Sequence, residues 1–161
     1  AFHLMRPVAS HDKHITDYCS WNGLLVLSGT RADAKSDGHI FADQKSGQSL
    51  WLGGIDDLWQ LGKPVGVGGP WKSSAIQANE PSDPYLMTGF DKKTLTLAAS
   101  VDTNFTIEVD VDHQSGWHSY QTIHVKSGVE VRHEFPDGFS AHWIRLRADR
   151  ECTATAIFMY E

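Results

Sequence analysis

The fold is decided by a stretch in the second half of the chain, residues 94–125, which reads TLTLAASVDTNFTIEVDVDHQSGWHSYQTIHV. Short runs of β-branched and aromatic residues are separated there by Asp, Ser and Gly. In the run FTIEVD every second residue from Phe105 onward is apolar, which is the pattern of a half-buried strand. No segment shows helical periodicity over more than about two turns. We therefore predict an all-β fold.

Other segments repeat this pattern, and their spacing indicates the architecture. From Pro84 onward, turn signals rich in Gly, Pro, Asp and Ser arrive about every ten residues. This spacing predicts an antiparallel β-sandwich of about seven strands over residues 83–161. The strand candidates in the whole chain are residues 24–28, 50–53, 85–90, 94–99, 104–110, 117–125, 129–135, 142–147 and 153–160.

Residues 1–82 have a different character and contain fewer strand candidates than a closed sheet needs. They are rich in Gly and carry Trp21, Trp51, Trp59 and Trp71. Trp-bearing strands joined by Gly-rich connections are typical of one propeller blade, which buries its faces only against neighbouring blades. We therefore expect a propeller-blade-like segment before the sandwich. The alternative is a set of long ordered loops that wrap over the sandwich and are held by Trp side chains.

Composition limits the class of partner. The 161 residues are 40% hydrophobic and 21% charged, with a formal net charge of −6. This balance is too apolar for disorder and lacks the long apolar runs of a membrane protein. Lys and Arg are scattered, so we expect neither nucleic acid nor an anionic membrane as a partner. A neutral or cationic partner suits the overall charge better.

The start of the chain and its cysteines give few constraints. The sequence begins with Ala1 rather than Met and shows no signal-peptide pattern, so we expect a processed or excised chain. Cys19 and Cys152 have no CxxC partner. Either they form a disulfide that closes most of the chain or they are two free thiols. A glycosylation triplet at Asn104 lies within a predicted strand.

Four strings cover most of the chain: DYCSWNGLLVLSG at 17–29, SLWLGGIDDLWQLGKPVGVGGPW at 49–71, EPSDPYLMTGFDKKTLTL at 80–97 and HEFPDGFSAHWIRLRADRECTATAIFMY at 133–160. These strings resemble the C-terminal part of large, uncharacterised, secreted bacterial proteins. In that family a propeller-like body precedes a β-sandwich tail, and the proteins are thought to act on polysaccharides. The resemblance implies a secreted or periplasmic location, a glycan partner and contact with the remainder of a larger protein. It carries over no catalytic motif, and this sequence departs from the family by lacking the propeller that precedes the tail.

Alternation along the strands predicts a binding face that is unusually aromatic and cationic. In residues 117–125 it places Trp117, Ile123 and Val125 inward. The outward residues of this segment are His118, Tyr120, Thr122 and His124. Flat rings can stack on sugars, and guanidinium groups can bind uronate carboxylates in a bidentate manner. The alternative is that this face packs against the Trp-rich front segment or a missing body. The predicted ligand-binding residues are Trp143, Arg145, Arg147, Tyr120, His118 and His124.

Metal and cofactor chemistry finds little support in the sequence. His3, His11 and His14 lie near Asp12 and Asp17, but no predicted element holds them in place. The run Asp110-Val111-Asp112 lacks the closing Glu of a calcium loop and indicates an acidic turn. No phosphate-binding loop or nucleophile elbow is present. We therefore predict no metal and no cofactor.

Two acidic pairs are the candidates for catalysis. Asp56 and Asp57 fit the first turn of a short helix, and Glu80 and Asp83 each precede a proline in turn-forming sequences. We therefore predict a non-catalytic carbohydrate-binding or accessory module. One alternative is a small glycoside hydrolase or polysaccharide lyase that uses His and carboxylate residues in a cleft between the halves. Another is a purely structural module.

Overall fold

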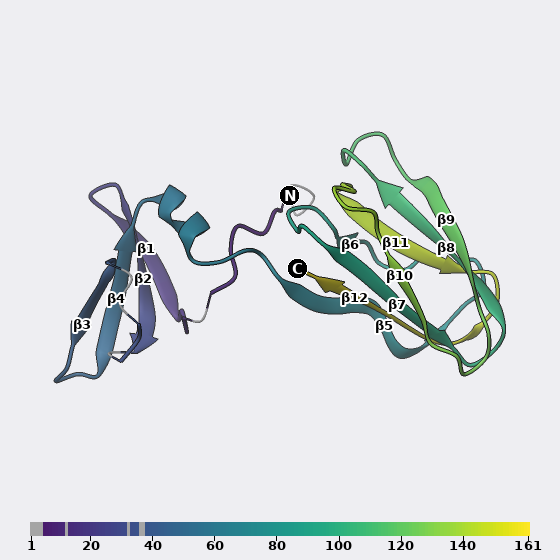
Figure 1. The fold of residues 1–161 in the computed structure, drawn as a ribbon, viewed down its shortest axis with the longest axis horizontal. Coiled ribbons are helices and arrows are strands. Elements are labelled where there is room, and N and C mark those ends of the chain that lie inside the picture. The colour runs from purple at the N-terminus through teal and green to yellow at the C-terminus, as the bar shows by residue number, and fades with distance from the viewer. Residues whose placement is uncertain (1–4, 12, 32, 36–37) are drawn as a thin grey trace. The chain divides into compact units, whose positions relative to one another are not determined.

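The computed structural model describes residues 5–11, 13–31, 33–35 and 38–161, and its regular structure is almost entirely antiparallel β-strand (Figure 1). The predicted all-β class is therefore confirmed. The described helical structure is a short 3-10 helix, η2 (Ile55–Gln60). Among the described residues no helix is long and apolar enough to cross a bilayer.

The chain divides into two compact units. We call Val8–Lys63 the front unit, and Pro64–Glu161 with the described residues before Val8 the rear unit. This boundary lies closer to the N-terminus than the predicted boundary between residues 82 and 83. The reason is a long strand, β5 (Gly66–Ile76), which pairs antiparallel with β12 (Cys152–Tyr160) inside the rear unit.

The front unit contains one four-stranded antiparallel sheet in the order β1-β2-β4-β3. This sheet contains two strands, β1 and β3, that were not among the strand candidates, and the alternative of long loops is wrong. Asn22 and Gly23 join the first two strands and both have positive φ values, 49° and 80°, as a tight hairpin turn requires. The strands are β1 (Asp17–Trp21), β2 (Leu24–Arg31), β3 (Ile40–Asp43) and β4 (Gln48–Gly53).

The core of the front unit is small. Its buried apolar side chains among the described residues are Leu27 and Trp51, which face each other across β2 and β4. The His39 ring lies 5.3 Å from the Trp51 ring. Trp21 and Trp59 are exposed, so they do not pin the segment as the sequence suggested. The unit therefore depends on few apolar contacts.

The rear unit is a β-sandwich of two four-stranded sheets, in the orders β10-β7-β12-β5 and β6-β11-β8-β9. The sandwich has eight strands because β5 joins the seven predicted ones, of which the candidate at residues 85–90 is shortened to the two-residue strand β6. The remaining strands are β6 (Tyr85–Leu86), β7 (Lys93–Ala99), β8 (Thr103–Asp110), β9 (His118–Val125), β10 (Val131–Glu134) and β11 (Trp143–Ala148).

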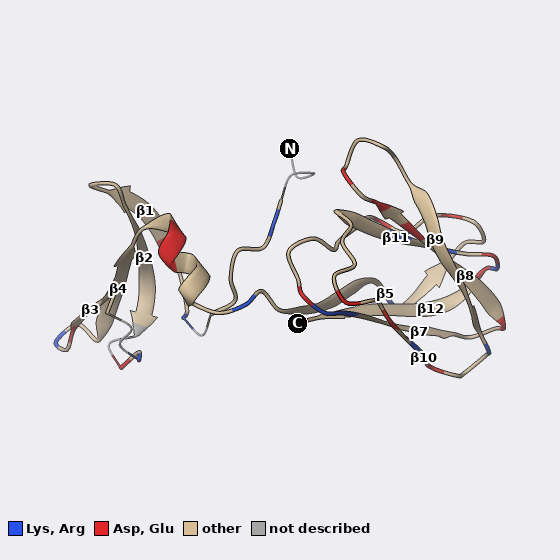
Figure 2. Cartoon of the chain, turned by 45° about the horizontal axis from the view of Figure 1, so that its top comes forward, with Lys and Arg blue, Asp and Glu red and all other residues tan. Residues whose placement is uncertain are grey.

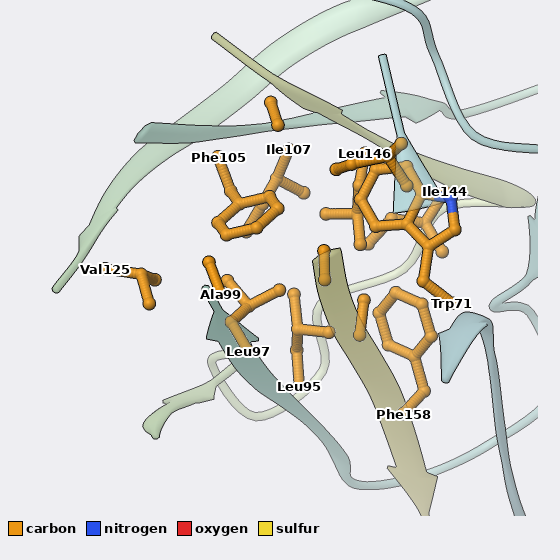
Figure 3. Close-up of a cluster of buried hydrophobic side chains, with 14 of the residues drawn as sticks. Trp71, Leu95, Leu97, Ala99, Phe105, Ile107, Val125, Ile144, Leu146 and Phe158 are labelled. Carbon is orange, nitrogen blue, oxygen red and sulfur yellow. The ribbon is translucent and has the colours of Figure 1, made fainter. Parts of the chain in front are cut away.

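Alternation fills the space between the two sheets with apolar side chains (Figure 3). Phe105, Leu146 and Phe158 have no exposed surface, whereas the neighbours of each in its strand are half-buried or exposed. The alternation predicted from Phe105 onward in β8 is confirmed, and β11 and β12 show the same alternation of buried and more exposed residues. Trp71 from β5 adds its ring to this core at 6.1 Å from the Phe105 ring.

A β-bulge changes the alternation along β9. Ile107 is opposite Gln121, but the next residue of β8, Glu108, is opposite Ser119. Tyr120 is therefore an extra residue in β9, and the side chains before it lie on the opposite face from that given by strict alternation. The predicted directions of Trp117 and Tyr120 are both wrong for this reason.

Candidate functional site

The candidate site is the outer face of the β6-β11-β8-β9 sheet. Arg145 and Arg147 alternate along β11 with Ile144 and Leu146, which have no exposed surface. The two arginines must therefore point away from the core. The register places Arg145 directly opposite Glu108 of the neighbouring strand β8.

Four residues on this face form what we call the arginine cluster: Glu108, Trp117, Arg145 and Arg147. Nε of Arg145 donates a hydrogen bond of 2.5 Å to Oε2 of Glu108, and its guanidinium carbon lies 4.3 Å from the centre of the Trp117 ring. A terminal nitrogen of Arg147 lies 3.4 Å from Oε1 of Glu108. The Glu108 side chain is 16% exposed, so water screens these charges less than on an open surface. The cluster is fixed by both charge and stacking.

Hydroxyl and imidazole groups continue this face across the sheet. Thr106 is opposite Arg147, and its hydroxyl lies 3.3 Å from the hydroxyl of Thr122 on β9. His124 Nδ1 lies 3.0 Å from Oδ1 of Asn104 in the next row. Trp143 alternates with the core residues of β11 and is half-buried. The structure thus brings Trp143, both arginines and His124 to one face.

Two of the six predicted binding residues are not on this face. Tyr120 turns inward at the open edge of the sandwich, where its ring lies 5.6 Å from Phe135 and 4.7 Å from Phe139. His118 is exposed but lies opposite Val109, an inward residue. The bulge explains both displacements.

Two residues of the cluster were not among the predicted binding residues. Glu108 could have been found, because alternation places a carboxylate and the arginines on outward faces of strands in one sheet. Trp117 could not, because strict alternation points it into the core. The candidate site therefore includes Trp117 and Glu108 and does not include Tyr120 and His118.

Asp149 lies in the turn after β11 and forms hydrogen bonds with the start of β8. Its Oδ1 accepts hydrogen bonds from the Asn104 backbone nitrogen at 2.9 Å and the Thr103 hydroxyl at 2.7 Å, and its Oδ2 accepts one from the Asn104 amide at 2.7 Å. These bonds, with the backbone nitrogen contributing most, lower the pKa of Asp149 to about 2. The side-chain amide of Asn104, the acceptor residue of the glycosylation triplet, is therefore hydrogen-bonded within the protein.

The acidic run after β8 forms a turn, as the sequence indicates. The Ser115 hydroxyl and the backbone nitrogens of Gln114 and Ser115 donate to the Asp112 carboxylate. These donors, the hydroxyl first, lower the pKa of Asp112 to about 2. Asp110 accepts the backbone nitrogen of His113. Both carboxylates stabilise the turn itself.

Nothing in the described part of the chain gathers three potential metal ligands. Of the histidines near the start, His11 and His14 are exposed, whereas His3 and Asp12 lie outside the described residues. Both cysteines are free thiols, Cys19 exposed on β1 and Cys152 buried at the start of β12. Of the two alternatives, the structure has the free thiols.

The acidic pairs considered for catalysis have structural roles or lie in turns. Oδ2 of Asp57 accepts the backbone nitrogen of Gly54 and caps η2, as expected for the first turn of a helix. Glu80 and Asp83 line a surface pocket of about 250 Å³ together with Ser82. The Ser82 hydroxyl donates to a backbone carbonyl and accepts the backbone nitrogen of Leu146. The Ser82 hydroxyl thus already donates and accepts hydrogen bonds within the protein.

The chain matches no model of a known protein family, and the search of curated proteins finds no significantly similar sequence.

Proposed function

We propose that this protein is a non-catalytic carbohydrate-binding module of a secreted, polysaccharide-associated protein. The outer face of the β6-β11-β8-β9 sheet is its glycan-binding surface. The observation that carries the proposal is the arginine cluster, in which Arg145 is held between Trp117 and Glu108 with Arg147 beside it. Such an arrangement presents fixed planar groups on rigid strands, which favours recognition of a repeating ligand.

The chemistry of the face suits a sugar chain. Trp143 and Trp117 are half-buried and offer apolar ring surface, while Thr106 and Thr122 carry hydroxyl groups on adjacent strands. Because the strands hold these side chains in place, little conformational freedom is lost when a ligand binds. The face can therefore combine stacking with hydrogen bonding at a small entropic penalty.

Binding without catalysis is favoured by how the carboxylates of the sheet are used. Hydrolysis of a glycosidic bond needs two carboxyl groups that can act on the substrate. On this face Glu108 is engaged by two arginines, and Asp110 is 8% exposed and accepts a backbone hydrogen bond. Neither carboxylate is placed to serve as a free acid or base.

The proposal is tested by affinity gel electrophoresis against neutral and acidic polysaccharides, with thin-layer chromatography of the same samples. Retarded migration without new products supports a binding module. New reducing ends or unsaturated uronates would instead identify an enzyme. Neither retardation nor products would leave a structural module.

Trp143→Ala tests the location of the surface. We expect weaker retention in the polysaccharide gel with the midpoint of thermal unfolding nearly unchanged, because Trp143 points away from the core. Trp59→Ala, which removes an exposed ring from the front unit, is the matched control and should retain full binding. Loss of folding in Trp143→Ala would show that this ring belongs to the core.

A further inference from the structure

We infer that the arginine cluster binds an acidic polysaccharide through its uronate carboxylates, and that Arg147 is the group that receives the carboxylate. This inference rests on the proposed function and specifies the ligand class of the same face. It follows from an imbalance between the two arginines, which share one glutamate but are held very differently.

Arg145 is the more tightly held of the two arginines. The hydrogen bond from its Nε to Glu108 is short, its guanidinium stacks on Trp117, and its side chain is 19% exposed. Its Nε and one face of its guanidinium are therefore used within the protein. We assign to Arg145 the role of positioning the surrounding groups.

Arg147 is held loosely by comparison. Its contacts to the Glu108 oxygens are 3.4 and 3.5 Å, longer than the 2.7–2.9 Å of a strong charge-assisted hydrogen bond. Its Nε is buried and out of reach of a ligand, but its side chain is 35% exposed, against 19% for Arg145. The terminal nitrogens of the guanidinium thus retain N–H donors that a carboxylate could accept.

The local charge also favours a single carboxylate. Glu108 is the carboxylate that pairs with both arginines, so at their guanidinium groups one positive charge is in excess, while Asp110 lies further along the same face opposite Trp143. Elsewhere on the rear unit, Lys and Arg are interspersed with Asp and Glu (Figure 2). A polyphosphate chain needs several neighbouring cations, which this surface does not offer. A sugar with one carboxylate per residue matches the surface better.

Neighbouring groups can hold the rest of the sugar. Thr106 is the cross-strand neighbour of Arg147, and Thr122 lies next to Thr106 on β9. This row spans three strands, or roughly 10 Å at the usual strand spacing. A uronate bound at Arg147 can therefore direct its ring hydroxyls to the two threonines.

The test compares polygalacturonate with its fully methyl-esterified form, a neutral glucan and dextran sulfate, by affinity electrophoresis and calorimetry. We expect binding to polygalacturonate and at least about tenfold weaker binding to the ester, which keeps the chain but removes the charge. Arg147→Gln should lose this preference, and Arg147→Lys should weaken binding about tenfold because the planar fork is lost. Glu108→Gln should bind polygalacturonate more tightly, because the competing carboxylate is gone.

Arg132→Gln is the matched control. Arg132 lies on β10 in the other sheet and also makes a long ion pair, at 3.4 Å to Glu134, so its loss should not alter binding. Wild-type affinity in folded Arg147→Gln would overturn the inference, as would a preference for dextran sulfate over polygalacturonate. Equal binding of neutral and acidic polysaccharides would overturn the inference and leave the proposed function standing. Absence of binding to every polysaccharide would overturn both.

Discussion

Asp149→Asn is expected to destabilise the rear unit at neutral pH and to lose this effect in acid. The carboxylate of Asp149 accepts three hydrogen bonds of 2.7 to 2.9 Å from Thr103 and Asn104. An asparagine at this position keeps one acceptor oxygen but replaces the other with an NH₂ group, which cannot accept a hydrogen bond from Thr103 or Asn104. Because Asn104 is the cross-strand neighbour of His124, the substitution also loosens one end of the proposed binding face.

The magnitude follows from the lowered pKa. A carboxyl group whose pKa falls from 3.8 to about 2 on folding would contribute at most roughly 2.5 kcal/mol, and water screening of this exposed group reduces the expected value to about 1 kcal/mol. The folded-state pKa is below the unfolded value, so the unfolded chain binds the proton more readily. The stabilisation is therefore complete above pH 3.8 and is lost as the pH falls from 3.8 toward 2.

Urea unfolding of wild type and variant at several pH values between 7 and 2 measures this difference. The gap in unfolding free energy should be about 1 kcal/mol at pH 7 and should approach zero near pH 2. Asp137→Asn is the control, because no hydrogen bond of the Asp137 carboxylate occurs within the described part of the chain. A gap of the same size at pH 7 and pH 2 would refute the electrostatic explanation.

Two further predictions concern the packing of the sandwich, and urea unfolding tests both. Gly69→Ala should lower the free energy of unfolding by about 2 kcal/mol or more, because the new Cβ would lie 1.9 Å from the carbonyl oxygen of Ala156. Gly66→Ala should change it far less, because the atom nearest to the new Cβ is 3.8 Å away. Equal effects would contradict the pairing of β5 with β12. Phe158→Ala should lower the free energy of unfolding by about 3–5 kcal/mol, because Phe158 is fully buried. Met159→Ala, at the neighbouring outward position, should change it by no more than about 0.5 kcal/mol. Similar losses for both variants would mean that the two faces of β12 are not distinguished as described.

β8 and β12 could be predicted because each has one face in the core and the other face toward water. In β8, Phe105, Ile107 and Val109 are buried while the residues between Phe105 and Val109 are half-buried. The same contrast in β12 makes the sequence pattern and the burial pattern coincide. Where the two faces of a strand have such different surroundings, alternation predicts both the strand and its orientation.

β5 could not be predicted in this way because its sequence, GVGGPWKSSAI, has the composition of a loop. It forms a strand at the edge of its sheet, where Pro70 is tolerated because a missing backbone donor matters less. Gly69 is required there by the close approach of the β12 backbone. Those contacts come from a strand more than 75 residues later, so no local pattern carries them.

The front hairpin carried a local signal that was not used. All five residues of β1 are exposed, so its sequence shows no alternation of burial. Asn22-Gly23 is nevertheless a strong hairpin signal when it lies between two extended runs, because both residues accept positive φ. Reading this turn would have found β1 as the partner of β2.

The candidate site shows how one extra residue can decide the chemistry of a surface. Without the bulge in β9, Tyr120 would stand on the outer face and Trp117 would point into the core. With the bulge, Tyr120 fills the open edge beside Phe135, and Trp117 stacks on Arg145. That stacking and the bond to Glu108 hold Arg145, whereas Arg147 is the more exposed of the two. The bulge thus fixes Arg145 and leaves Arg147 as the arginine that we propose for ligand binding.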